Sequence, residues 1–120
     1  MGYCFQLQIY DVSGNFVENY EYAGSYGAET VLGFLRELRD LCYECWSPLT
    51  EDVLWFLDDL QYDIVECSEI LESFNALKIA TDEGTVKWSN EDRHKMFKDF
   101  HKTFRKVVKL GGHIKQTLHD

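Results

Sequence analysis

The chain lacks the features that would attach it to a membrane or export it. Its longest uninterrupted apolar run is a few residues, whereas a membrane-spanning helix needs about 20. Met1-Gly2-Tyr3-Cys4 has neither the charged nor the apolar region of a secretory signal, and Gln6 stands where N-myristoylation requires Ser or Thr. We therefore expect a protein without membrane or lipid anchor, located in the cytoplasm.

Catalytic, nucleotide-binding and metal-binding motifs are also missing. The sequence contains no GxxxxGK[ST], GxGxxG, GxSxG, HExxH or EF-hand loop. His94 and His101 are seven residues apart, too far along a helix to share one metal ion, and no H-x3-H pair exists. We therefore predict no catalytic residue, no metal and no cofactor.

Cysteines are few, and their spacing favours structural thiols. Cys42 and Cys45 form the only CxxC pair, without the second pair that a zinc site normally requires. This pair lies near the end of its predicted helix, whereas redox pairs use the positive N-terminus of a helix. Together with Cys4 and Cys67 they are expected to be reduced cysteines, most of them in the core, of a protein in a reducing compartment.

What the chain does contain predicts one α+β domain. At 120 residues and 45% hydrophobic content it can bury a single core. Alternation and helical periodicity predict strands at 3–10 and 16–22, helices at 28–46 and 51–74, strands at 76–80 and 85–88, and a helix from about Ser89 to Gly111. The expected architecture is a small antiparallel sheet of about four strands, made of two hairpins and packed with three helices in the order ββααββα. Residues 111–120 are expected to form a polar tail, with at most one more helical turn.

Charge is divided unevenly between the two parts of the chain. Residues 1–86 contain 17 acids and three bases, a charge of −14, and residues 87–120 contain four acids and nine bases, a charge of +5. The acidic part disfavours direct binding of nucleic acid or an anionic membrane and favours a basic protein partner. The alternative is that the low pI only keeps the protein soluble.

The predicted helix at 51–74 would carry its acids on one side, without any base. Trp55 and Tyr62 lie among these acids, opposite the apolar seam that begins at Val53. They are either covered by the sheet or anchors for a partner with the acids as a rim. An Mg²⁺ site within the same acids is a further alternative. The candidate partner-binding residues are Trp55, Asp58, Asp59, Tyr62, Asp63, Glu66 and Glu69.

The last predicted helix carries a basic stripe within about 100° of the helical wheel. This stripe is a solvated surface, a contact for the acidic helix of a second subunit in a homodimer, or a contact for a phosphate backbone. Its residues are Lys95, Lys98, Lys102, Arg105, Lys106 and Lys109.

From these patterns we expect a small, acidic, non-enzymatic interaction protein. Its anionic helical face would bind and inhibit or recruit a basic partner, for example a nucleic-acid-handling protein whose groove accepts carboxylates in place of phosphates. The alternatives are a nucleic-acid or nucleoprotein accessory factor that uses the basic helix, and an enzyme whose dispersed site has no sequence motif.

Overall fold

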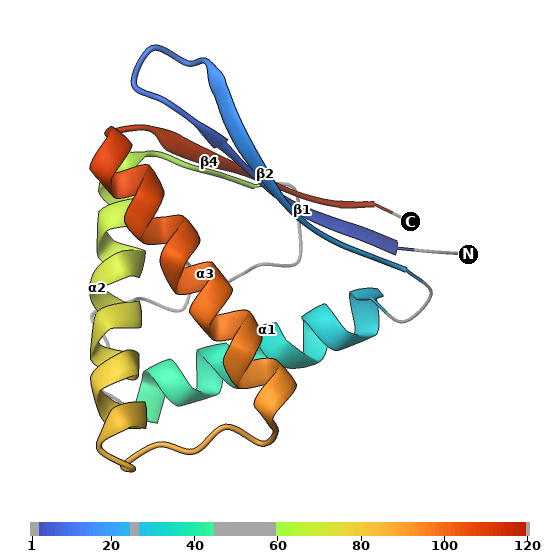
Figure 1. Cartoon of the computed structure of the whole chain (residues 1–120), viewed down its shortest axis with the longest axis vertical. Helices are drawn as coiled ribbons and strands as arrows, with labels where there is room; N and C mark the ends of the chain where they lie inside the picture. The colour runs from blue at the N-terminus through green and yellow to red at the C-terminus, as the bar shows by residue number, and fades with distance from the viewer. Residues whose placement is uncertain (1–2, 25–26, 45–59, 120) are drawn as a thin grey trace.

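The computed structural model describes residues 3–24, 27–44 and 60–119, which form one four-stranded antiparallel sheet and three helices (Figure 1). The strand order is β2-β1-β4-β3. The elements are β1 (Tyr3–Tyr10), β2 (Phe16–Gly24), α1 (Gly27–Glu44), β3 (Leu60–Tyr62), α2 (Ile64–Asp82), α3 (Glu91–Leu110) and β4 (His113–His119). The predicted α+β class, with four strands and three helices, is confirmed, and the predicted order ββααββα matches roughly.

The N-terminal hairpin forms where the alternating pattern predicts it. Phe5, Leu7 and Ile9 of β1 are buried beneath the helices, while the intervening side chains point to the other face of the sheet. Asp11 closes the turn, because its Oδ1 accepts hydrogen bonds of 2.9 Å from the N–H groups of Ser13 and Asn15. This local chemistry sets the register in which β1 meets β2.

The C-terminal segment is not the expected polar tail, because residues 113–119 form the inner strand β4. It pairs antiparallel with β1, from Tyr10 opposite His113 to Cys4 opposite His119, and with the short strand β3 on its other side. The two ends of the chain therefore lie at the same end of the sheet (Figure 1). Ile114 and Gln116 are fully buried on the helix side.

The predicted helix at 51–74 is confirmed from Ile64 onward, where α2 lies, and is wrong at residues 60–62, which form β3; residues 51–59 lie outside the described residues. Leu60–Tyr62 is a strand because β4 supplies its pairing partners. Asp63 then begins α2, since its carboxylate accepts the N–H of Glu66 at 2.8 Å. The predicted second hairpin is also absent: α2 continues to Asp82 and contains the expected strand at 76–80, and the segment 85–88 is a connection.

The burial pattern explains why α2 continues past the predicted strand. The fully buried residues Cys67, Ile70, Phe74 and Leu77 are spaced by three, four and three, which places them on one side of a helix. A strand from residue 76 would break this line at Leu77. The helix instead ends where Gly84 adopts a positive φ of 78°.

The third helix follows its sequence signals closely. Asn90, one residue after the expected Ser89, is the cap, and its side chain accepts the N–H of Arg93 at 2.9 Å. Gly111 ends the helix in the left-handed conformation with φ of 68°, as predicted for the Gly111-Gly112 pair.

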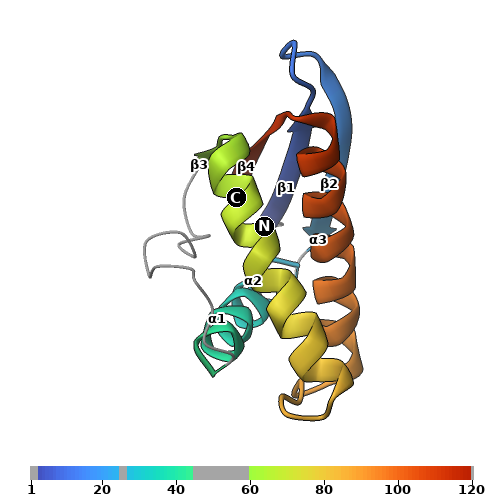
Figure 2. The same cartoon turned by 90° about the vertical axis from the view of Figure 1, so that its left-hand side faces the viewer.

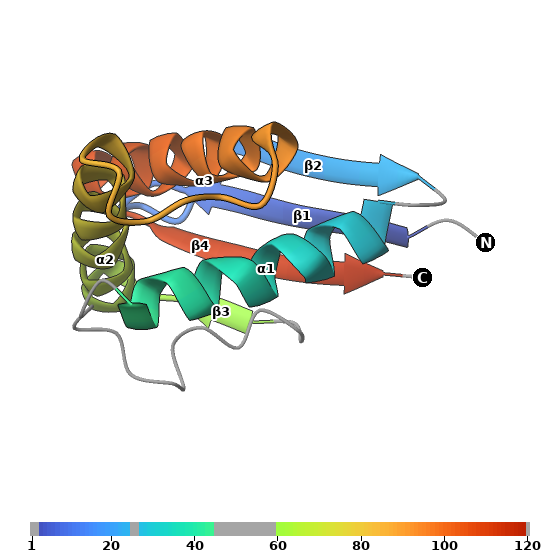
Figure 3. The ribbon, with the colours of Figure 1, turned by 90° about the horizontal axis from the view of Figure 1, so that it is seen from below.

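All three helices lie on one side of the sheet (Figures 1 and 3). The antiparallel pair α2 and α3 stands side by side, and α1 crosses near their connection (Figure 2). Aromatic rings pack these helices together. The ring centroids of Phe34 of α1 and Phe100 of α3 are 4.9 Å apart, and those of Phe74 of α2 and Phe104 of α3 are 5.2 Å apart. The first predicted helix is confirmed from Ala28 to Glu44, and its last two predicted residues, 45–46, lie outside the described residues.

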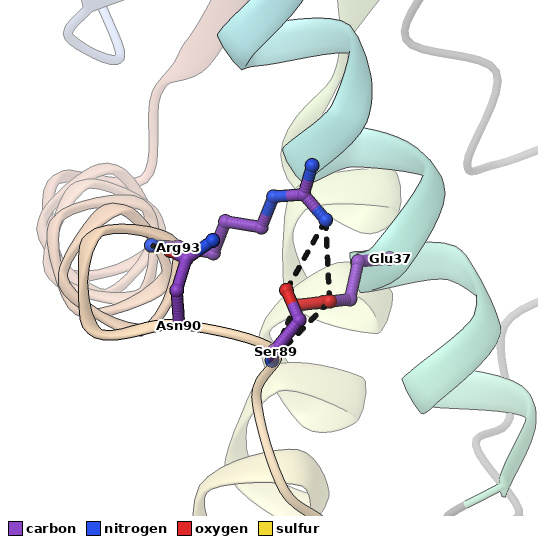
Figure 4. Close-up of polar contacts among 4 residues, drawn as sticks. All are labelled: Glu37, Ser89, Asn90 and Arg93. Atoms are coloured by element: carbon purple, nitrogen blue, oxygen red, sulfur yellow. Dashed lines mark hydrogen bonds and ion pairs between the residues drawn. The ribbon is translucent and has the colours of Figure 1, made fainter.

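A half-buried polar cluster attaches α1 to the connection before α3 (Figure 4). The Arg93 guanidinium donates to Glu37 Oε1 at 3.3 Å and to the Ser89 hydroxyl at 3.2 Å. Glu37 also accepts the backbone N–H of Ser89 at 3.2 Å. A Cβ added at Gly33 would lie 2.5 Å from Arg93 Nη2, so the guanidinium packs against the backbone of α1.

We expect Glu37→Ala to lower the free energy of unfolding by about 1.5 kcal/mol, because Arg93 and the Ser89 N–H lose a charged acceptor. This value is at the low end for charged hydrogen bonds, since Arg93 is partly exposed to solvent. Urea denaturation measures the change. Arg36→Ala, at an exposed position of the same helix, is the control, and an equal effect of both substitutions would contradict the assigned role.

Candidate functional site

An open cleft of about 440 Å³, the acidic cleft, lies where three connections meet at one end of the sheet. The turn after β1 contributes Asp11 and Val12, and the connection after α3 contributes Gly111 to His113. The remaining wall consists of the end of β3 and the first turn of α2, with Asp63, Ile64 and Glu66. The cleft therefore combines segments that are about 100 residues apart in the chain.

Three carboxylates line this cleft, and none of its described lining residues is Lys or Arg. Two of them are held by local hydrogen bonds: Asp63 caps α2, and Asp11 accepts N–H groups of its turn. These backbone bonds lower the pKa of Asp11, with the N–H of Asn15 as the largest contribution. Both acids are thus fixed in position at the cleft.

The pKa of Glu66 reflects this clustering of negative charge. Partial burial raises its pKa first, and the neighbouring Asp63 and Glu69 raise it further. When neighbouring carboxylates raise the pKa of a carboxyl group, they destabilise its charged form, and a cation that approaches the group stabilises that form again. The cleft is therefore an electrostatically favourable place for a cationic group.

Exposed apolar side chains border the same acids. Val12, at the tip of the hairpin, is 78% exposed, and Val65, in the first turn of α2, is 62% exposed. Ile64 lines the cleft and is 36% exposed. Single exposed apolar residues are ordinary, but Val12 and Ile64 line the charged cleft itself, and this combination of apolar and anionic surface favours a partner that has both kinds of group.

The cleft contains part of the predicted partner-binding set. Asp63 and Glu66 line it, and Glu69 is close enough to Glu66 to raise its pKa. Trp55, Asp58 and Asp59 lie outside the described residues.

Tyr62 is 3% exposed and packs near Phe104, so it supports the cleft from the core and does not have the exposed position of an anchor. Because β3 precedes α2, Tyr62 also does not share a helical face with Glu66.

Sequence reasoning missed Asp11 and Val12. Asp11 carries the signal of a turn residue, which indicates its hydrogen bonds to the hairpin but not its position opposite Asp63 and Glu66. Only the pairing of β1 with β4, and of β4 with β3, brings the hairpin tip to the start of α2.

The six residues of the predicted basic stripe are all exposed on α3. Lys106 forms an ion pair with Glu18 of β2. Among the residues that the structure describes, the other five have no acidic partner within salt-bridge distance. The stripe is therefore neutralised on the side of β2 and open elsewhere.

The two cysteines with described side chains belong to the core. Cys42 and Cys67 are buried, as predicted, and Cys4 and Cys45 contribute no described side chain. Burial raises the pKa of Cys67 to about 12, and its thiol donates to the Tyr62 carbonyl at 3.4 Å. Within residues 3–24, 27–44 and 60–119, no three His, Cys, Asp or Glu side chains converge as metal ligands.

Comparison with protein-family models, with curated proteins and with solved structures finds no significant match to this chain. None of the described helices is both long and apolar enough to cross a membrane. Function is therefore inferred from the residues of the site.

Proposed function

We propose that this protein is a non-enzymatic binding module that holds a basic segment of a partner protein in the acidic cleft. The observation that carries this proposal is the combination of Asp11, Asp63 and Glu66 in one cleft without a described Lys or Arg. A basic, nucleic-acid-handling protein is the class of partner that we expect, because the Lys- and Arg-rich segments with which it contacts phosphates can contact carboxylates instead.

The neighbouring apolar residues indicate which basic segment fits best. Arginine and lysine have long aliphatic stems, which can cover Val12 and Ile64 while the charged head reaches the carboxylates. Arginine has the further advantage of forming two parallel hydrogen bonds with one carboxylate. We therefore expect a segment in which arginines alternate with aliphatic residues.

Binding is tested by fluorescence anisotropy with a labelled peptide of alternating Arg and Leu. The variant Asp11→Asn/Asp63→Asn/Glu66→Gln should weaken binding at least about tenfold, because it removes three charges at the cleft. Asparagine retains the turn and the helix cap, so the fold should survive. Raising the salt concentration should weaken the wild-type complex in the same direction.

The matched control is Glu72→Gln/Glu83→Gln/Glu91→Gln, which changes the net charge equally at exposed positions outside the cleft. Equal loss in both triple variants would mean nonspecific attraction to an acidic protein and would overturn the site. A peptide in which citrulline replaces arginine should not bind.

Self-association is the alternative occupant of the cleft, with the stripe on α3 of a second copy as the basic segment. Sedimentation equilibrium over a range of protein concentrations separates the two cases. A dimer that dissociates in the acid-to-amide cleft variant, together with no peptide binding, would replace the foreign partner by a second copy.

A further inference from the structure

A second hollow, the α2–α3 groove, has the opposite charge. It has a volume of about 340 Å³, within the range of small-molecule sites, and is lined by residues of α2 and α3. These two helices run antiparallel, side by side (Figure 2). His94, Lys98, His101 and Arg105 follow one line along α3, with spacings of four, three and four residues. Phe97 lies beside His101, with ring centroids 5.7 Å apart and nearly parallel planes.

The charges in this groove do not cancel. Its described lining residues include Lys78, Lys98, Lys102 and Arg105 as cations and Asp82 and Asp99 as anions, a net charge of +2 with neutral histidines. Asp82 already pairs with Lys78 at 2.6 Å, and Asp99 accepts a hydrogen bond of 3.3 Å from the Tyr20 hydroxyl. Asp82 also attracts Lys98 at longer range, but within the described part of the chain Lys98, Lys102 and Arg105 have no acid at salt-bridge distance.

We infer that the α2–α3 groove binds a small organic phosphate. Lys98, Lys102 and Arg105 would hold the phosphate, and its apolar or planar body would lie against the lining formed by Phe97 and His101. A phosphate monoester is a dianion at neutral pH, which matches the net charge of the groove. Phosphate oxygens also accept the charged hydrogen bonds that lysine and arginine donate.

This ligand class fits the groove better than a nucleic-acid strand does. Lys95 and Lys109, at the ends of the stripe, are not among the described lining residues, so the cations around the groove are compact and not extended along the helix. The acidic remainder of the chain repels an extended polyanion. A small dianion inside the groove is largely screened from those acids that lie more than about 8–10 Å away at ordinary salt.

His101 supplies an independent reporter inside the groove. It is buried, and its Nε2 lies 2.7 Å from Asn75 Oδ1. Burial holds its pKa below the ordinary value, and the nearby charges of Arg105 and Lys78 lower it further. A phosphate bound among these cations would offset their effect, so the pKa of His101 should rise when the groove is occupied.

The test is calorimetric titration with adenosine 5′-monophosphate, adenosine and inorganic phosphate as probes. We expect the monophosphate to bind more tightly than adenosine or phosphate alone, because it uses both the cations and the lining. Lys98→Gln/Arg105→Gln should weaken it at least about tenfold, whereas Lys95→Gln/Lys109→Gln, with the same charge change on the same helix, should leave it within about twofold. NMR titration of His101 should show a pKa that rises with the monophosphate and not with adenosine.

Several results would overturn this inference. Equal affinity for adenosine and its monophosphate would remove the role of the cations, and equal loss in both double variants would mean diffuse attraction. Binding of a ten-residue single-stranded oligonucleotide without binding of the monophosphate would assign α3 to nucleic acid. Absence of binding by all probes at millimolar concentration would leave the groove without this ligand class. Each outcome is separate from that of the acidic cleft, which uses other residues.

Discussion

Phe100→Ala should be among the most destabilising single truncations in the described core, with a loss of about 3–5 kcal/mol in the free energy of unfolding. Phe100 is fully buried, and its ring contacts three elements. It stacks on Phe5 of β1 at 5.9 Å, and it meets Tyr20 of β2 edge to face at 5.6 Å and Phe34 of α1 in the same way at 4.9 Å. The truncation therefore leaves a cavity where the sheet, α1 and α3 join.

A domain of this size is stable by about 5–15 kcal/mol in total, so this loss is a large part of its stability. The midpoint temperature of unfolding should fall by roughly 10–20 °C. Calorimetry and urea denaturation measure the two quantities. Phe100→Leu should lower the free energy of unfolding by clearly less, since leucine retains most of the buried volume. Lys95→Ala, on the exposed side of α3, should change it by less than about 0.5 kcal/mol. A loss below about 1 kcal/mol for Phe100→Ala would show that the three elements are not joined through this ring.

The second large effect is expected at Gly112, where the chain passes from α3 to β4. A Cβ added there would lie 1.7 Å from the carbonyl oxygen of Tyr10 and 2.8 Å from its carbonyl carbon. Backbone atoms within a sheet cannot move aside as a flexible side chain can. Gly112→Ala should therefore destabilise the protein by about 3 kcal/mol or more, at or above the usual range for overpacking.

Gly111→Ala is the matched control, because the adjacent glycine is required for a different reason. Its φ of 68° is unfavourable for alanine, but the nearest atom to an added Cβ is Val12 Cβ at 4.0 Å. The cost should be only about 1–2 kcal/mol, that of the left-handed conformation. If urea denaturation ranked the two variants in the reverse order, the close approach of the α3–β4 connection to β1 would be refuted.

Gly112→Ala also links stability to the acidic cleft, since residues 111–113 form one of its walls. At a temperature where the variant is still folded, the connection must move away from Tyr10. The arginine–leucine peptide should then bind more weakly than to the wild type, although all three carboxylates remain. Gly111→Ala should retain most of that binding.

The candidate site could be predicted in part. The excess of acids around Asp63, Glu66 and Glu69 is visible in the sequence, and the cations of α3 are visible as a stripe. The sequence does not show which of the cations on α3 are neutralised by an acid of the same chain and which remain open. Lys106 is neutralised because β2 brings Glu18 to it, whereas Lys98 and Arg105 face α2, where Asp82 is already paired with Lys78.

The sequence by itself determined the elements whose signals are local. The alternating pattern and turn chemistry define the hairpin of β1 and β2, and helical periodicity defines α1. The capping signal at Ser89, one residue before the observed cap Asn90, and the glycine at Gly111 mark the two ends of α3. Each of these depends on residues within about 20 positions of one another, so its stabilising contacts are visible in a short window.

Tertiary structure alone decided β3, β4 and the start of α2. Residues 60–62 are too few to show a period, and they form a strand only because β4 offers free backbone groups beside them. β4 itself is defined by its pairing with β1, and the paired residues Cys4 and His119 are 115 positions apart in the chain. Backbone hydrogen bonds between such distant segments are not encoded in either segment's own pattern, and they carry Asp11 to the acids of α2 and form the cleft.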